Sequence, residues 1–121
     1  MSKKAITVDD SKTMRDMVSF TLKGAGFDVL EAEDGQDALS VLGDSKVDVI
    51  ITDLNMPNMN GIELIKSLRG HNVHQHTPIL MLTTEGDAGK KDEGKQAGAT
   101  GWLVKPFDPA KLISVVNKVC P

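Results

Sequence analysis

The chain has 121 residues, of which 40% are hydrophobic, which is enough for one globular domain with a single core. The formal net charge is −3 and like charges are not blocked together, so we expect no nucleic-acid surface. There is no apolar run long enough for a transmembrane helix, no signal peptide, and one cysteine, Cys120, which excludes an internal disulfide. These features predict a cytoplasmic domain.

Short apolar runs recur along the chain, and each is too short for a helix, which predicts strands. They cover five ranges: 5–8, 27–32, 47–51, 78–82 and 101–104. Apolar residues at helical spacing lie between and after them, which predicts amphipathic helices. Strands that alternate with helices and are themselves mostly apolar predict an α/β fold, with a parallel sheet covered on both faces.

Capping residues mark the expected helix boundaries. The predicted starts are N-caps at Ser11, Asp34 and Asp108, the last followed by Pro109, together with Gly61 for the third helix. Glycines mark the predicted ends: Gly24 and Gly26, Gly43, and Gly70. The fourth helix, about residues 87–97, has two glycines in its expected interior, Gly89 and Gly94, and no large apolar residue. We therefore expect it to be weakly protected.

Residues 71–76 include three histidines, and such a cluster can bind a metal ion. However, no cysteine, aspartate or glutamate lies within this segment. A solvated polar loop is the interpretation that we favour.

Polar residues follow four of the predicted strands. The first strand leads to Asp9 and Asp10, the third to Asp53, the fourth to Thr83 and the fifth to Lys105. A lone aspartate after a strand usually begins a turn. Here, right-handed crossovers place the C-terminal ends of all parallel strands at one edge. We therefore expect these side chains to meet there.

Clustered carboxylates raise each other's pKa unless a cation is present. Mg²⁺ is the natural cation, because it takes one or two carboxylates and adds substrate phosphate oxygens. Lys105 would offer a point charge to a phosphate oxygen or to Asp53, and Thr83 a hydroxyl. Backbone groups around Asn55 would complete the shell. Such a site suits phosphoryl transfer onto a carboxylate, giving an aspartyl-phosphate.

The sequence resembles the receiver domains of two-component response regulators, and most closely the single-domain chemotaxis regulators of the CheY type. The resemblance spans nearly the whole chain. It rests on five motifs: Val8-Asp9-Asp10-Ser11, Glu33-Asp34-Gly35, Asp53-Leu-Asn-Met-Pro57 with Gly61, Leu82-Thr83, and Lys105-Pro106-Phe107. It implies one receiver domain over residues 1–121 without an output domain, and a flavodoxin-like, CheY-like sheet in the order 2-1-3-4-5.

The resemblance also implies roles for individual residues. Asp53 would accept a phosphoryl group from a phosphohistidine on a sensor kinase. Asp10, Asp53 and the backbone carbonyl of Asn55 would ligate Mg²⁺, and Asp9 would contribute through metal-bound water. Lys105 would contact the phosphate.

A switch follows from the same resemblance. Thr83 would swing toward the phosphate and the aromatic residue at position 102 would turn inward, which biases a surface made by the fourth helix, fifth strand and fifth helix. Two departures stand out. Position 102 holds Trp102 where many chemotaxis relatives have tyrosine, and the fourth helix lacks the apolar residues that motor-binding relatives offer.

The function that we expect is that of a monomeric CheY-type regulator, phosphorylated by a histidine kinase, that binds the flagellar motor switch or a phosphatase and no membrane. The alternative within this class is a phosphate sink or relay without motor binding. A Mg²⁺-dependent phosphatase would need a second acid two residues after its nucleophile, and that position is Asn55. A flavin-binding domain is less supported, because the chain has no tyrosine and no phosphate loop after the first strand. We therefore expect no turnover of external substrates.

Overall fold

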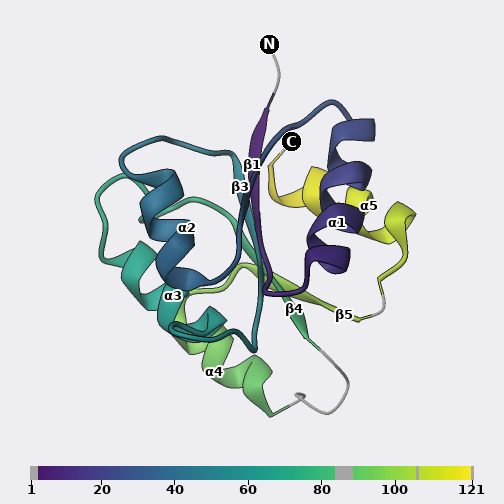
Figure 1. Ribbon diagram of the computed structural model, residues 1–121. Helices are drawn as coiled ribbons and strands as arrows, with labels where there is room; N and C mark the ends of the chain where they lie inside the picture. Colours follow the sequence, from purple (N-terminus) through teal and green to yellow (C-terminus); the bar gives the residue numbers. More distant parts are fainter. Residues whose placement is uncertain (1–2, 84–88, 106, 121) are drawn as a thin grey trace.

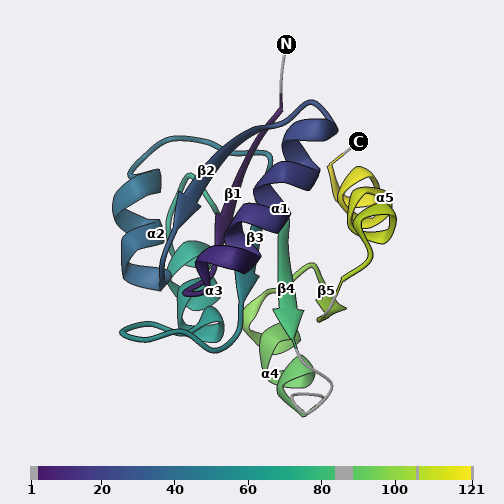
Figure 2. The ribbon, with the colours of Figure 1, turned by 45° about the vertical axis from the view of Figure 1, so that its right-hand side comes forward.

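A parallel sheet forms the centre of the protein, as seen in a computed structural model that describes residues 3–83, 89–105 and 107–120 (Figure 1). Its five strands are β1 (Lys4–Val8), β2 (Asp28–Ala32), β3 (Val49–Asp53), β4 (Ile79–Thr83) and β5 (Gly101–Val104). They lie in the order β2-β1-β3-β4-β5, and all neighbouring strands are parallel (Figure 2). The predicted fold class and strand order are confirmed.

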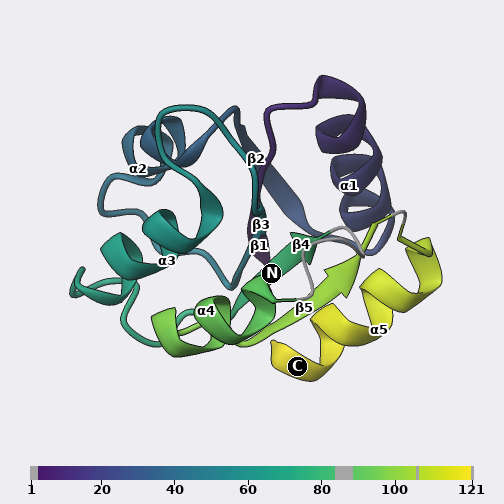
Figure 3. The ribbon, with the colours of Figure 1, turned by 90° about the horizontal axis from the view of Figure 1, so that it is seen from below.

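The helices form a layer on each side of the sheet (Figures 1 and 3). One layer holds α1 (Lys12–Gly24) and α5 (Pro109–Val119), and the other holds α2 (Gly35–Leu42), α3 (Gly61–Arg69) and α4 (Lys90–Ala97). No helix in the described ranges is both long and apolar enough to cross a membrane.

Strand residues alternate between two separate hydrophobic clusters. In β3, Ile50 packs with the buried side chains of α2 and α3, whereas Val49 and Ile51 pack with those of α1 and α5. This is the period of two that a strand imposes, with both faces covered. All five residues of β3 are buried, so the strand that carries Asp53 is held from both sides.

Most helix starts confirm the predicted caps. The side chains of Ser11, Asp34 and Asp108 each accept a hydrogen bond from a backbone amide in the first turn of the following helix. For α3, the cap is Asn60, which exchanges hydrogen bonds with Glu63 in a capping box. The third strand differs from its prediction, because it begins two residues later and includes Asp53, whose partner across the ladder is Leu82.

The fourth helix departs from its prediction. It begins at Lys90, so Gly89 is its N-cap and not an interior residue, and the expected start at residues 87–88 lies outside the described residues. Gly94 is interior and buried. A Cβ there would lie 2.2 Å from Cε of Met81, so the glycine lets α4 approach β4 closely.

The histidine segment also differs from the expected solvated loop, because His74 is only 1% exposed. Arg69 at the end of α3 holds this segment by donating hydrogen bonds to the carbonyls of His74 and Thr77. Nε2 of His71 lies 3.3 Å from Oδ1 of Asp44. A loop that packs against the end of a helix in this way buries one of its histidines. Among the described residues, it forms no three-ligand metal cluster.

Candidate functional site

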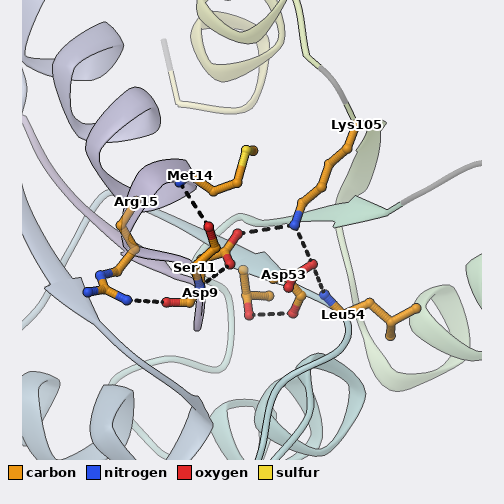
Figure 4. Close-up of polar contacts among 8 residues, drawn as sticks. Asp9, Ser11, Met14, Arg15, Asp53, Leu54 and Lys105 are labelled. Carbon is orange, nitrogen blue, oxygen red and sulfur yellow. Dashed lines mark hydrogen bonds and ion pairs between the residues drawn. The ribbon is translucent and has the colours of Figure 1, made fainter.

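The end of β1 places two acids side by side in different surroundings. Asp9 is buried, and its Oδ1 accepts a hydrogen bond from the Ser11 amide at 2.9 Å. Ser11 in turn caps α1 by accepting a hydrogen bond from the Met14 amide at 3.3 Å (Figure 4). Asp10 is exposed. The turn from strand to helix therefore fixes one carboxylate inside the protein and leaves its neighbour open to solvent.

Asp53 ends β3, and its side chain is 10% exposed. Its Oδ1 accepts a hydrogen bond from the Leu54 amide and lies 2.9 Å from Nζ of Lys105. Burial raises the pKa of Asp53, and the charge of Asp9 raises it further, although the hydrogen bond from Lys105 acts in the opposite direction. Burial and the charge of Asp9 thus disfavour the ionised form of Asp53, and a nearby positive charge such as that of Lys105 stabilises it.

Lys105 joins the two buried acids. Its Nζ lies 2.9 Å from Asp53 and 3.2 Å from Oδ2 of Asp9, and its side chain is 18% exposed (Figure 4). Burial alone would lower the pKa of Lys105, but the hydrogen bond and charge of Asp53 and the charge of Asp9 outweigh it and raise the pKa. The amine is therefore protonated at neutral pH. The Lys105 amide also donates to the carbonyl of Thr83, which ties the ends of β5 and β4 together.

The three carboxylates form a cluster that can take a cation. One oxygen from each of Asp9, Asp10 and Asp53 lies within 4.8 Å of the other two. Oxygen donors with full negative charge suit a hard divalent ion, and Mg²⁺ requires only one or two of them. The donor set therefore fits a divalent ion such as Mg²⁺. Lys105 supplies one positive charge to the same edge of the sheet.

The loop after Asp53 is shaped by contacts that the sequence did not reveal. Asn58 has a positive φ of 65° and donates a hydrogen bond to the buried carboxylate of Asp34 at 2.8 Å. The Asp37 amide, with Asn58 second, lowers the pKa of Asp34, so this carboxylate is ionised. The Gly35 amide also donates to the carbonyl of Met59. The N-terminus of α2 therefore holds the loop after Asp53 in place. In the sequence, only the predicted role of Asp34 as a helix cap pointed to this contact.

Gly61 closes the loop against the strand. Its amide donates to the Leu54 carbonyl, and a Cβ at this position would lie 2.4 Å from the carbonyl oxygen of Asp53. Only glycine permits this approach without movement of the backbone. The start of α3 thus lies directly against the residue that carries the central carboxylate.

Nearly the whole chain matches a known family. The profile described as the response regulator receiver domain covers residues 5–117. The chain belongs to the response regulator receiver domain family. The acids and the lysine at the strand ends of this receiver all lie within the matched residues.

Named relatives of this receiver domain include chemotaxis proteins. It is 41% identical over 117 residues to chemotaxis protein CheY-3 of Vibrio cholerae, which covers 96% of this chain and 90% of the relative. It is 45% identical over 111 residues to a CheY homolog of Campylobacter jejuni, with coverage of 90% and 85%. The solved structure of the chemotaxis response regulator CheY4 of Vibrio cholerae is 50% identical, covers 98% and 99% of the two chains, and superposes with a TM-score of 0.92. The receiver is thus a CheY-like signalling domain.

The remaining predicted residues of the receiver lie around the carboxylate cluster. Thr83 ends β4, is 1% exposed, and its hydroxyl has no hydrogen-bond partner among the described residues. Asn55 is exposed in the loop after Asp53. Trp102 in β5 is half-buried against the hydrophobic cluster that holds Ile50 and the buried side chains of α2 and α3, and Nζ of Lys91 lies 5.7 Å from the centre of its ring. The structure therefore brings Asp9, Asp53 and Lys105 into contact, with Asp10 beside them, and places Trp102 against the helices.

Proposed function

We propose that the protein is a CheY-type response regulator that accepts a phosphoryl group on Asp53 from a histidine kinase. The observation that carries the proposal is the lysine ammonium 2.9 Å from a buried carboxylate that has two further acids beside it. An ion pair that only stabilises a fold also joins a lysine to a carboxylate, but it does not require two further carboxylates beside it. Relatives named as chemotaxis proteins support the same assignment.

In the proposed transfer, an oxygen of the Asp53 carboxylate attacks the phosphorus of a phosphohistidine. The oxygen–phosphorus bond of an acyl phosphate forms and the nitrogen–phosphorus bond breaks, with its electron pair left on the imidazole nitrogen, which takes up a proton. Asp10, Asp53 and the Asn55 carbonyl would hold Mg²⁺, with Asp9 contributing through metal-bound water, and the ion would supply positive charge to the phosphoryl oxygens. Lys105 would move from the carboxylate to the new phosphate, because a point charge follows the greater negative charge.

The burial of Thr83 and Trp102 supports a switch downstream of this step. The buried hydroxyl of Thr83 has no hydrogen-bond partner in the part of the chain that the structure describes, and a buried polar group without a partner is costly. A phosphate oxygen on Asp53 would offer that hydroxyl an acceptor, since Asp53 and Thr83 end adjacent strands. Movement of Thr83 would then change the packing around β5 and Trp102.

The phosphoacceptor is tested by labelling with phosphoramidate in the presence of Mg²⁺. Asp53→Asn should abolish the incorporation of phosphate, whereas Asp16→Asn, an exposed acid on α1, should label like the wild type. Normal labelling of Asp53→Asn would refute the assignment of the site. Incubation with an external phosphate ester tests the alternative of a phosphatase. We expect no release of phosphate, because the exposed amide of Asn55 cannot act as a general acid.

We propose the flagellar motor switch as the downstream target, with a phosphate sink or relay as the second candidate. The composition of α4 favours the second candidate, because Lys90–Ala97 presents lysines, acids and a glutamine and no large apolar side chain. A pull-down of the motor switch protein with phosphorylated and unphosphorylated protein distinguishes them. Phosphorylation-dependent capture supports motor binding. Absence of capture, with phosphotransfer from a histidine kinase intact, supports the sink.

A further inference from the structure

Arg15 on α1 forms a hydrogen bond with the main chain of Asp9, the first of the two adjacent acids Asp9 and Asp10. Its Nη1 donates a hydrogen bond of 2.7 Å to the carbonyl oxygen of Asp9, and its side chain is 13% exposed (Figure 4). A guanidinium donor makes a stronger hydrogen bond than a neutral one, and this donor is largely shielded from water. Glu31 on β2 lies 3.6 Å from Nε of Arg15 and holds the guanidinium from the other side.

The carbonyl of Asp9 controls where Asp10 is placed. A peptide group is planar, so the Asp9 carbonyl and the Asp10 nitrogen share one rigid plane. The other polar groups of Asp9 already have partners. Its amide donates to the Ala32 carbonyl, its Oδ1 accepts from the Ser11 amide, and its Oδ2 accepts from Lys105. With Arg15 bound to the carbonyl, the residue before Asp10 cannot rotate without breaking several hydrogen bonds.

The Asp10 carboxylate has no such support of its own. It is exposed, and no hydrogen bond or ion pair joins it to any part of the chain that the structure describes. Even so, it lies in the three-carboxylate cluster with Asp9 and Asp53. Its position therefore depends on the backbone that carries it, and Arg15 is the side chain that holds that backbone.

We propose that Arg15 is a positioning residue for the cation site, because it fixes the Asp9–Asp10 peptide and so directs the Asp10 carboxylate toward Asp53. This inference rests on the proposed function, in which that carboxylate is a ligand of Mg²⁺. Arg15 itself carries a positive charge and would not touch the cation. It acts through the main chain, as residues behind the ligands of a metal site do.

The test is the affinity for Mg²⁺, measured by isothermal titration calorimetry without a phosphodonor. Arg15→Met keeps the length of the side chain and removes the donor, and should weaken Mg²⁺ binding about tenfold or more, as is typical when support behind a ligand is lost. Arg15→Lys can donate one hydrogen bond with less fixed geometry, and should bind Mg²⁺ about threefold more weakly than the wild type but more tightly than Arg15→Met.

Lys12→Met is the matched control. Lys12 lies in the first turn of the same helix and carries the same charge, but it pairs with Asp16 and its side chain is 79% exposed. This variant should bind Mg²⁺ like the wild type. An equal loss of affinity in Lys12→Met and Arg15→Met would show that the loss does not depend on the hydrogen bond to the Asp9 carbonyl, and would overturn the proposal.

The free energy of unfolding, measured in urea, separates positioning from stability. Weaker binding by a folded Arg15→Met supports the proposal, and unchanged affinity in that variant overturns it. If Arg15→Met does not fold, the comparison of Arg15→Lys with the wild type decides: reduced affinity supports the proposal and equal affinity overturns it. Absence of Mg²⁺ binding in the wild type would instead refute the proposed cation site, independently of Arg15.

Discussion

Three helix glycines stand in different surroundings, and the replacement of each by alanine should therefore have a different effect. A Cβ at Gly24 would meet no atom within 4 Å. At Gly94 it would meet the end of the flexible Met81 side chain at 2.2 Å. At Gly61 it would meet backbone, 2.4 Å from the Asp53 carbonyl oxygen and 3.2 Å from Cα of Leu54.

Two opposing effects set the size of each change. Alanine is favoured over glycine within a helix by about 0.5–1 kcal/mol, and less at the ends. Overpacking of a filled site costs about 1–3 kcal/mol. Gly24→Ala should thus leave the free energy of unfolding unchanged or raise it by up to about 1 kcal/mol. Gly61→Ala should lower it by about 1–2 kcal/mol, because the backbone that it meets cannot rotate away. Gly94→Ala should lie between them, since a thioether adapts its shape.

Urea denaturation followed by circular dichroism measures all three variants on the same scale. Gly61→Ala should also lower the rate of phosphorylation by a small phosphodonor, because relief of the contact moves the backbone of Asp53. Gly24→Ala should be phosphorylated at the wild-type rate. A urea midpoint for Gly61→Ala equal to or above that of Gly24→Ala would refute the argument from close approach.

Further predictions concern charge and the aromatic switch. Burial, with the charge of His71 second, lowers the pKa of His74 below 6.5, so only the unfolded chain takes up a proton there as the pH falls below 6.5. The free energy of unfolding should therefore fall below pH 6.5, by at most about 1.4 kcal/mol per pH unit, and this dependence should disappear in His74→Gln. The pKa of Asp53 is raised by burial and by Asp9, so the ionised carboxylate destabilises the fold, and Asp53→Asn should increase the urea midpoint of the metal-free protein; a decrease would show that the bond to Lys105 dominates. Trp102 is the single tryptophan, and its emission should shift on phosphorylation beyond the effect of Mg²⁺ alone; identical spectra would argue against the aromatic switch. Hydrogen exchange in 90–97 should be faster than in 109–119, and equal protection would contradict the expected weakness of α4.

Local sequence patterns determined much of this protein. Each strand was marked by a short apolar run and most helices by a cap, because these features depend on residues within one turn of each other. The meeting of Asp9, Asp53 and Lys105 followed from one further rule, that parallel strands with right-handed crossovers end at a common edge. The fold class and the composition of the carboxylate cluster could therefore be predicted from the amino-acid sequence alone.

The tertiary structure decided which groups support that cluster. Nothing in the sequence pairs Asn58 with Asp34, or Arg15 with the carbonyl of Asp9, because these contacts join separate elements and depend on how the helices lie on the sheet. The same holds for the burial of His74 in a polar segment. Close packing between elements cannot be derived from periodicity, which specifies the face of a helix but not its distance from a neighbour. The sequence by itself thus determined the strands and the residues at their ends, and only the packing of α1, α2 and α3 against the sheet decided which side chains hold those residues in place.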